Sequence, residues 1–296
     1  ESVVQGAITI ARKMNVSPLL IGFTIVAVGT SLPELAVTIN AVSSNSQELV
    51  DLAVGGVLGS NVANVMLVLG TAAMLGACDK PGIEIKKDAI AVIMASIILL
   101  LTVMRGEITQ IVGILMIIAL ITYYFYSYNY SKKLGLDEEL EETWMGENFL
   151  LAMIITILGG AMIVLGAELL IEGSVGIADS FGISESIVGL SVIALGTSLP
   201  ELAVTMIAAL RGHKGVAIGN VLGSNVINIL GILGISSAYA GGILVSEDFA
   251  GRDIWVVLVT SGLIAAMLLN ERKITKTLGA VMVIGYLSYM TLLYTI

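Results

Sequence analysis

Long apolar runs dominate this chain and restrict it to folds that exist in a lipid bilayer. Charged residues make up only 12% of the sequence, about half of the roughly 25% found in soluble domains. A helix needs about 20 apolar residues to cross the hydrocarbon core. The pattern therefore predicts an integral membrane protein with an all-α fold. Its apolar runs fall at about 17–42, 51–76, 88–104, 108–126, 149–178, 184–211, 215–242, 253–269 and 274–295.

A ten-residue sequence that occurs twice indicates an internal repeat. Gly29–Thr38 reads GTSLPELAVT, and Gly196–Thr205 is identical to it. A second pair of matching segments follows, since Val57–Val62 and Val221–Val226 both read VLGSNV. The sequence therefore predicts two halves with the same series of helices.

The alignment of the two halves also predicts how many helices each one contains. It pairs Glu1 with Glu168, which lies well inside the run 149–178. We therefore expect the first helix to be truncated, by about 20 residues if it spans the membrane. With that helix restored, the fold has ten transmembrane helices in two five-helix repeats. Because five is odd, the repeats are inverted, with broken helices at the midplane, an arrangement typical of secondary transporters.

The predicted domains follow the repeats. The first inverted repeat covers 1–126, an acidic linker covers 127–148, and the second inverted repeat covers 149–296. Six of the acidic residues lie between Asp137 and Glu147. We interpret them as part of a solvated loop; a regulatory cation site is the alternative, and no other feature of the sequence supports it.

Basic residues fall almost entirely on one side of the predicted helices. Of the 14 Lys and Arg residues, only Arg105 and Arg252 lie in loops on the opposite side. The positive-inside rule then predicts a cytoplasmic linker and two external termini. We expect a multi-pass protein of the cell membrane, most naturally a prokaryotic plasma membrane, whose surroundings are the lipid bilayer.

The rarity of certain residues excludes several functional classes. One cysteine, Cys78, cannot form a disulfide framework or a cysteine metal cluster, and one histidine, His213, argues against a histidine metal site or triad. No glycine-rich phosphate loop with a lysine is present, so ATP drive has no support. No basic field suits nucleic acid. We expect no enzyme, no cofactor and no obligate protein partner.

Glu34 and Glu201 are the strongest candidates for chemistry. Each lies inside an apolar run, where a carboxylate is costly and by default suggests a function. Inverted symmetry would bring both to one central pocket. Such a hard, oxygen-rich pocket suits calcium, magnesium or manganese. The alternative is a protonated glutamate that bonds to a neighbouring helix.

Pro33 and Pro200 directly precede these acids and predict a break in each helix. Proline lacks an N–H and clashes with the carbonyl four residues earlier. We therefore expect the carbonyls around Ala27–Thr30 and Ala194–Thr197 to lack helical donors, which is tolerated at this depth where backbone lines a cavity. A simple kink for packing is the alternative. Hydroxyl oxygens stand beside each break, at Thr30, Ser31, Thr197 and Ser198.

A second set of oxygen donors comes from Ser60 and Asn64 in one half and from Ser224 and Asn228 in the other. A residue and its fourth neighbour share one face of a helix, so each pair can face the carboxylates from an adjacent span. Amides in lipid can instead simply join two helices.

The two blocks Gly29–Gly70 and Gly196–Gly234 resemble the α-repeats of the cation/calcium antiporter superfamily, in its sodium/calcium exchanger branch. The resemblance implies an antiporter that exchanges Na⁺ for Ca²⁺ by alternating access. It implies that Glu34 and Glu201 ligate Ca²⁺ with the carbonyls of Thr30 and Thr197. It also implies two Na⁺ sites and a shared centre: Ala27, Thr30, Ser31 and Ser224; Ala194, Thr197, Ser198 and Ser60; and, in the middle, Asn64 and Asn228.

One departure from the pattern concerns Asn228, where several branches of the superfamily carry an aspartate. The core of this chain then holds two carboxylates, whose charge matches one Ca²⁺. The proton-coupled branch typically carries asparagine where this chain has Thr30 or Thr197, so Na⁺ coupling is favoured. Exchange of H⁺ for Ca²⁺ or another divalent cation, a cation channel and a cation sensor are the alternatives.

Overall fold

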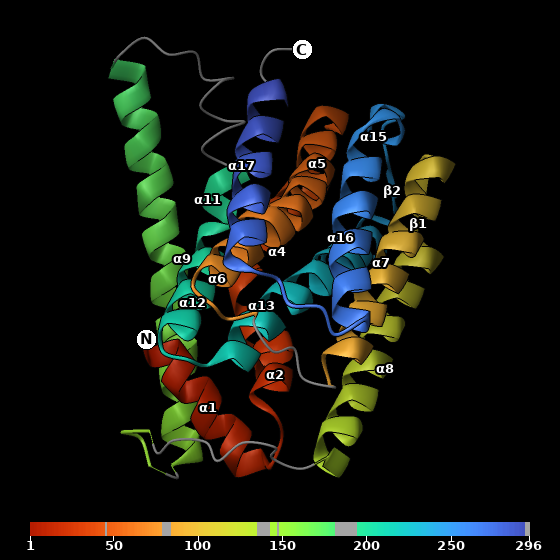
Figure 1. The fold of residues 1–296 in the computed structure, drawn as a ribbon. Coiled ribbons are helices and arrows are strands. Elements are labelled where there is room, and N and C mark those ends of the chain that lie inside the picture. Colours follow the sequence, from red (N-terminus) through yellow and green to blue (C-terminus); the bar gives the residue numbers. More distant parts are fainter. Residues whose placement is uncertain (45, 79–83, 135–142, 147, 181–193, 294–296) are drawn as a thin grey trace.

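The computed structural model describes residues 1–44, 46–78, 84–134, 143–146, 148–180 and 194–293, and these are almost entirely helical (Figure 1). The first half contains α1 Ser2–Met14, α2 Pro18–Ile21, the π-helix η1 Gly22–Val26, α3 Ala27–Thr30, α4 Leu32–Ser43, α5 Gln47–Ala63, the π-helix η2 Asn64–Leu69, α6 Gly70–Met74, α7 Ile85–Arg105, β1 Glu107–Thr109 and α8 Gln110–Leu134. The second half contains α9 Phe149–Ser180, α11 Ala194–Thr197, α12 Leu199–Leu210, α13 Lys214–Val226, the π-helix η4 Ile227–Leu233, α14 Gly234–Ala240, β2 Gly242–Leu244, α15 Asp248–Gly251, α16 Asp253–Leu269 and α17 Lys276–Leu293.

These helices confirm the predicted all-α membrane fold. Within the described residues, five helices are by themselves long and apolar enough to cross a membrane, and α2 to α4 form a sixth, bent span. Shorter apolar helices at 199–210, 253–269 and 276–292 supply more of the predicted spans. The beginning of the predicted span 184–211 lies outside the described residues. The five long helices cover 47–74, 85–105, 110–134, 149–166 and 214–240.

The predicted break before Glu34 is confirmed. The segments Pro18–Thr30 and Leu32–Ser43 meet at 45°, and Ser31 between them has φ −90° and ψ 7°. The expectation that the Ala27 carbonyl lacks a helical donor was wrong. It accepts from the Ser31 N–H at 3.1 Å and from the Thr30 hydroxyl at 3.2 Å, because α3 completes its last turn before the chain bends.

Two glycine crossings repeat the same packing in the two halves. In α8, a Cβ at Gly113 would lie 2.7 Å from the Gly234 carbonyl oxygen, and in α17 a Cβ at Gly279 would lie 2.5 Å from that of Gly70. Gly113 and Gly279 are equivalent in the repeat, as are Gly70 and Gly234. Each half therefore presses its last helix against the α6 or α14 segment of the other half, where only glycine permits such close approach.

A short antiparallel strand pair, which the sequence did not predict, also joins the halves. Ile108 in β1 lies opposite Ile243 in β2, so the α7–α8 turn is tied to the segment that follows α14. The equivalent place in the other half has a backbone hydrogen bond of 3.3 Å, from the Ile274 N–H to the Cys78 carbonyl. The loops that connect the helices therefore make equivalent contacts in the two halves.

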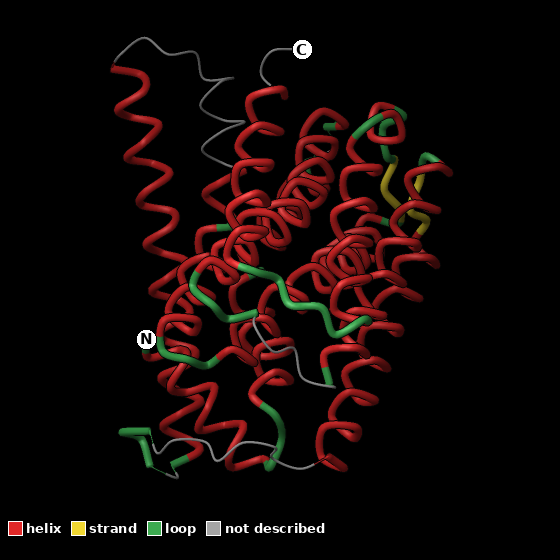
Figure 2. Tube along the Cα trace, in the orientation of Figure 1, coloured by secondary structure: helices red, strands yellow, loops and turns green. Residues whose placement is uncertain are grey.

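We call the end of the bundle that carries Arg12, Lys13, Lys132 and Lys133 the basic end. It holds the carboxyl ends of α1 and α8, at the bottom of Figure 1, while α17 ends at the opposite side near the top. The loops of both ends are visible in Figure 2.

The predicted boundary between span and linker was wrong. Helix α8 continues eight residues beyond the expected end at 126, to Leu134. Ser131 is fully buried there and accepts a 2.8 Å hydrogen bond from the Ser17 N–H, so this polar stretch packs against the start of α2. Linker residues 135–142 and Glu147, and thus all six clustered acids, lie outside the described residues, while Thr143 hydrogen-bonds Thr9 of α1 at 2.5 Å.

Candidate cation site

Two buried carboxylates mark the centre of the bundle. Glu34 lies in the first turn of α4, just after the first break, and is 4% exposed; Glu201 lies in the first turn of α12, just after Ser198, and is 1% exposed. They are close enough for the charge of Glu201 to act on Glu34. Inverted packing therefore brings the two acids together, as the repeat predicts.

Glu201 is held by donors from two other elements. The Ser31 hydroxyl, at the break of the first half, donates to Glu201 Oε1 at 3.0 Å. The Ser224 hydroxyl, from α13, donates to the same oxygen at 3.4 Å. The Thr30 hydroxyl also interacts with this carboxylate. Three hydroxyl groups predicted for one Na⁺ site, two from the first repeat and one from the second, thus surround Glu201.

Glu34 has a different environment. Both of its carboxylate oxygens are buried and find no hydrogen-bond partner within the described part of the chain. Thr197, which stands where Thr30 stands in the other half, interacts with Glu34 electrostatically. A buried carboxylate without a full set of partners is costly, and a cation is the group that would satisfy it.

Further buried polar atoms without partners belong to the predicted site residues on neighbouring elements. Asn64 starts η2 and Asn228 lies in η4; π-turns inside helices often occur at functional sites. Nearly all buried polar groups in proteins are hydrogen-bonded, so these exceptions call for a ligand. Among the described residues, buried side-chain atoms of the predicted site without a partner are Glu34 Oε1 and Oε2, Glu201 Oε2, Ser198 Oγ, and both amide atoms of Asn64 and Asn228.

The remaining residues of the predicted site are Ala27 in α3, Ser60 in α5, and Ala194 and Thr197 in α11. Ala27 and Ser60 are buried, and Thr197 is half-buried. Ala194 begins α11, and its side chain lies outside the described set. Ser60 in α5, Asn64 in η2, Asn228 in η4 and Ser198 just before α12 are all buried, and the described structure gives none of them a hydrogen bond to either carboxylate.

Asn220, on α13, was missed by the sequence reasoning and is fully buried. Its Oδ1 accepts from the Thr30 hydroxyl at 3.3 Å, and its Nδ2 donates to the Thr205 hydroxyl at 3.0 Å and to the Glu201 carbonyl at 3.4 Å. The equivalent position in the first half is Gly56. A search by repeated residues therefore passes over Asn220, although asparagine in an apolar run is itself a signal.

Asn61 and Asn225 were also missed, although both belong to the repeated VLGSNV segment. They are equivalent in the repeat and touch each other, since Asn225 Nδ2 donates to the Asn61 carbonyl at 3.4 Å. They join α5 to α13 where the two helices cross. The amide oxygen of each is buried without a partner in the described structure.

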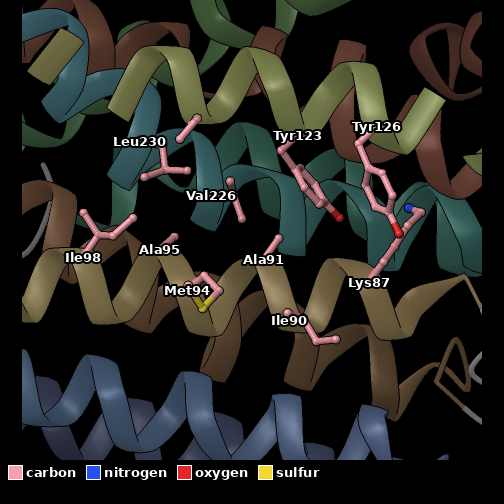
Figure 3. Close-up of a pocket in the computed structure, with 11 residues that line it drawn as sticks. Lys87, Ile90, Ala91, Met94, Ala95, Ile98, Tyr123, Tyr126, Val226 and Leu230 are labelled. Atoms are coloured by element: carbon pink, nitrogen blue, oxygen red, sulfur yellow. The ribbon is translucent and has the colours of Figure 1, made fainter. Parts of the chain in front are cut away.

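The chemistry of the site is that of oxygen alone. The described residues contain no group of three or more His, Cys, Asp and Glu side chains arranged to hold a metal. Two carboxylates among hydroxyls and amides suit a hard cation. A cavity of about 390 Å³ lies between α7 and α8, with Val226 of α13 and Leu230 of η4 also in its lining (Figure 3), and no carboxylate is among its lining residues.

Comparison with known proteins decides the family. A family profile described as sodium/calcium exchanger protein matches residues 1–129 and 151–295. The chain belongs to the sodium/calcium exchanger family. It is therefore a multi-pass membrane antiporter that exchanges Ca²⁺ for another cation, and not an enzyme.

Individual members of this family align over nearly the whole chain. A putative antiporter, CaxA, from Alkalimonas amylolytica is 34% identical over 99% of this chain and 93% of its own length. The sodium/calcium exchanger MaX1 from Methanosarcina acetivorans is 30% identical over 99% and 93%. A solved structure of the sodium-calcium exchanger NCX_Mj superposes with a TM-score of 0.81 at 27% identity, covering 98% of this chain and 92% of that one.

Proposed function

We propose that this family member exchanges Na⁺ for Ca²⁺ across a cell membrane by alternating access. The observation that carries the proposal is the pair Glu34 and Glu201, buried together in the middle of the bundle among neutral oxygen donors. Two negative charges match one Ca²⁺. The name of the relative MaX1, a sodium/calcium exchanger, supports the same pair of ions.

In this proposal both carboxylates bind Ca²⁺, together with the backbone carbonyls of Thr30 and Thr197. Na⁺ ions occupy the flanking positions and share the same charges. Hydroxyl oxygens are suitable Na⁺ ligands, and Ser31 and Ser224 already converge on Glu201. The flanking positions and the centre are formed by Ala27, Thr30, Ser31 and Ser224; by Ala194, Thr197, Ser198 and Ser60; and by Asn64 and Asn228.

The decisive experiment is calcium flux in proteoliposomes with an imposed gradient of Na⁺, K⁺ or H⁺. Calcium uptake should follow the Na⁺ gradient and saturate with both ions. Calcium uptake that is unaffected by the Na⁺ gradient but follows a pH gradient would identify H⁺, in place of Na⁺, as the coupling ion. Unsaturable flux independent of any counter-ion would indicate a channel.

We further propose that the basic end faces the cytoplasm of a prokaryotic cell, so that both termini are external. The positive-inside rule supports this orientation. In a Cys78→Ser background, a cysteine replacing Glu48, an exposed residue at the start of α5, should react with an impermeant reagent in intact cells. A cysteine replacing Lys133 should react only after permeabilisation; the reverse pattern would invert the orientation.

A further inference from the structure

A buried polar cluster lies where α7 starts, on two helices that contribute no residue to the proposed transport site. Asp88 is fully buried, and its Oδ1 accepts hydrogen bonds from Lys87 Nζ at 2.8 Å and from the Tyr123 hydroxyl at 2.5 Å. Tyr123 belongs to α8, so the cluster pins the two helices together. Lys87 and Tyr123 project from facing helices at one end of the apolar cavity in Figure 3.

The second repeat contains the same pin at the opposite end of the bundle. Asp253, at the start of α16, accepts from Arg252 Nε and from the Tyr289 hydroxyl of α17, both at 3.1 Å. These three residues are the repeat equivalents of Asp88, Lys87 and Tyr123, at offsets of 165 and 166. An acid, a base and a tyrosine are thus sufficient to join such a helical hairpin.

The contact between α7 and α8 is surrounded by two polar side chains that its counterpart lacks. Glu84 Oε1, Asp88 Oδ2 and Ser127 Oγ are buried, and none of the three has a hydrogen-bond partner among the described residues. The repeat equivalents of Glu84 and Ser127 are Phe249 and Leu293. Pinning the hairpin therefore does not account for these two polar side chains.

Glu84 and Ser127 are both linked to Asp88, one directly and one through Tyr123. Glu84 lies one helical turn before Asp88 and acts on it electrostatically, as neighbours four apart on a helix do. Ser127 lies one turn after Tyr123 on α8 and interacts with the Tyr123 hydroxyl, which is bound to Asp88. Glu84 is 7% exposed, while Asp88 and Ser127 are fully buried, so Glu84 is the member of the cluster nearest to the surface.

We propose that Glu84, Asp88 and Ser127 form a second cation site, separate from the transport site. Two carboxylates and the Lys87 ammonium leave a net charge of −1, which selects a monovalent ion. Oxygen ligands alone suit an alkali cation, Na⁺ or K⁺. Bound there, the ion satisfies the unpaired oxygens and strengthens the contact between α7 and α8. This inference does not depend on which ion drives calcium transport.

The test measures thermal unfolding of the full chain in detergent with NaCl, KCl or choline chloride at equal ionic strength. A Glu34→Gln, Glu201→Gln background removes the carboxylates of the transport site. We expect Na⁺ or K⁺ to raise Tm over choline by roughly 5 °C at saturation. Adding Glu84→Gln and Ser127→Ala should abolish that rise, whichever of the two ions gives it.

Two further variants keep the test independent of folding defects. Asp253→Asn weakens the matching pin, and the response to Na⁺ or K⁺ should remain unchanged. Lys87→Gln makes the net charge of the site more negative, from −1 to −2, and the cation concentration for half-maximal stabilisation should fall about tenfold, a gain that damage to the fold cannot produce.

Several results would overturn the proposal. These are an equal Tm in choline, Na⁺ and K⁺, a full response in the Glu84→Gln, Ser127→Ala variant, or no gain of affinity in Lys87→Gln. Stabilisation by low pH that is unaffected by alkali cations would assign the unpaired oxygens to a shared proton instead.

Discussion

Glu34 and Glu201 occupy equivalent positions in two identical ten-residue segments, yet their surroundings differ. Glu201 Oε1 accepts from Ser31 at 3.0 Å and from Ser224 at 3.4 Å, and Asn220 donates to its backbone carbonyl. Neither carboxylate oxygen of Glu34 has a hydrogen-bond partner in the described structure. Identical local sequence has therefore given one anchored acid and one open acid.

The difference teaches that the site is symmetric in composition but not in supporting contacts. Part of the asymmetry is fixed in the sequence, because Asn220 has Gly56 as its equivalent. The rest belongs to this conformation, in which Ser31 bonds across to the opposite acid while the Ser198 hydroxyl has no partner in the described structure. The two acids of the repeat are therefore held unequally in this structure.

Neutralising either acid should have the largest effect. Glu34→Gln and Glu201→Gln should each reduce calcium exchange at least 100-fold, because each removes half of the charge that balances Ca²⁺. Their effects on stability should differ, however. Glu34→Gln should raise Tm more in ion-free buffer, since it removes an unsatisfied charge from the interior. Near-normal exchange in both variants would end the shared-site proposal, and equal Tm changes would end the distinction between anchored and open acids.

Asn220→Ala should have the next largest effect. It removes three hydrogen bonds that align Thr30, Thr205 and the backbone at Glu201, and loss of such supporting partners typically costs about 10- to 100-fold in affinity or activity at metal sites. Calcium exchange should fall within that range while the protein remains extractable. The matched control is Gly56→Ala, at the equivalent position; if it impaired exchange equally, Asn220 would have no special positioning role.

Alanine variants of the two serines beside the breaks should show a smaller effect, on the Na⁺ dependence of exchange. A hydrogen bond to a charged group contributes about 1.5–3 kcal/mol, so Ser31→Ala should raise the Na⁺ concentration for half-maximal exchange about tenfold. Ser198→Ala, which loses no described hydrogen bond, should raise it about twofold or less. Calcium affinity should change less in both variants. Equal shifts in Na⁺ dependence would show that the contact to Glu201 is unimportant for coupling.

The glycine crossings should give the smallest effect on exchange and should act alike in both halves. Gly113→Ala and Gly279→Ala each force a Cβ against a backbone carbonyl, and overpacking of this kind typically costs about 1–3 kcal/mol of stability. Gly262→Ala in α16, where a Cβ would meet nothing described within 4 Å, is the control. Unequal losses at Gly113 and Gly279 would mean that the asymmetry of the site extends into the scaffold.

The sequence predicted those parts of the fold that depend on repetition and on costly residues. The duplicated GTSLPELAVT segment, the prolines and the two glutamates were sufficient to predict inverted halves, a bend before Glu34 and the burial of both acids. The predicted end of α8 was wrong because Ser127 and Ser131 are polar residues that packing nevertheless buries. Hydropathy alone cannot distinguish such a helix from a loop.

Other features depended on contacts between residues far apart in the chain. The β1–β2 pair involves three residues on each side, from opposite repeats, and such short segments carry no strand signal of their own. Asn220 lacked an equivalent and so escaped a search for repeated residues. The pairing of Ser31 with Glu201 rather than with Glu34 depends on the conformation, which the sequence does not specify.

The π-turns also carry information about how this chain arose. Asn64–Leu69 and Ile227–Leu233 place a wide turn at equivalent points of the two halves. A π-turn contains one more residue than an α-turn, so it corresponds to a one-residue insertion within a regular helix. Since both halves carry it beside the same asparagine, the simplest history places the insertion in a half-length ancestor, before gene duplication joined two copies into one chain.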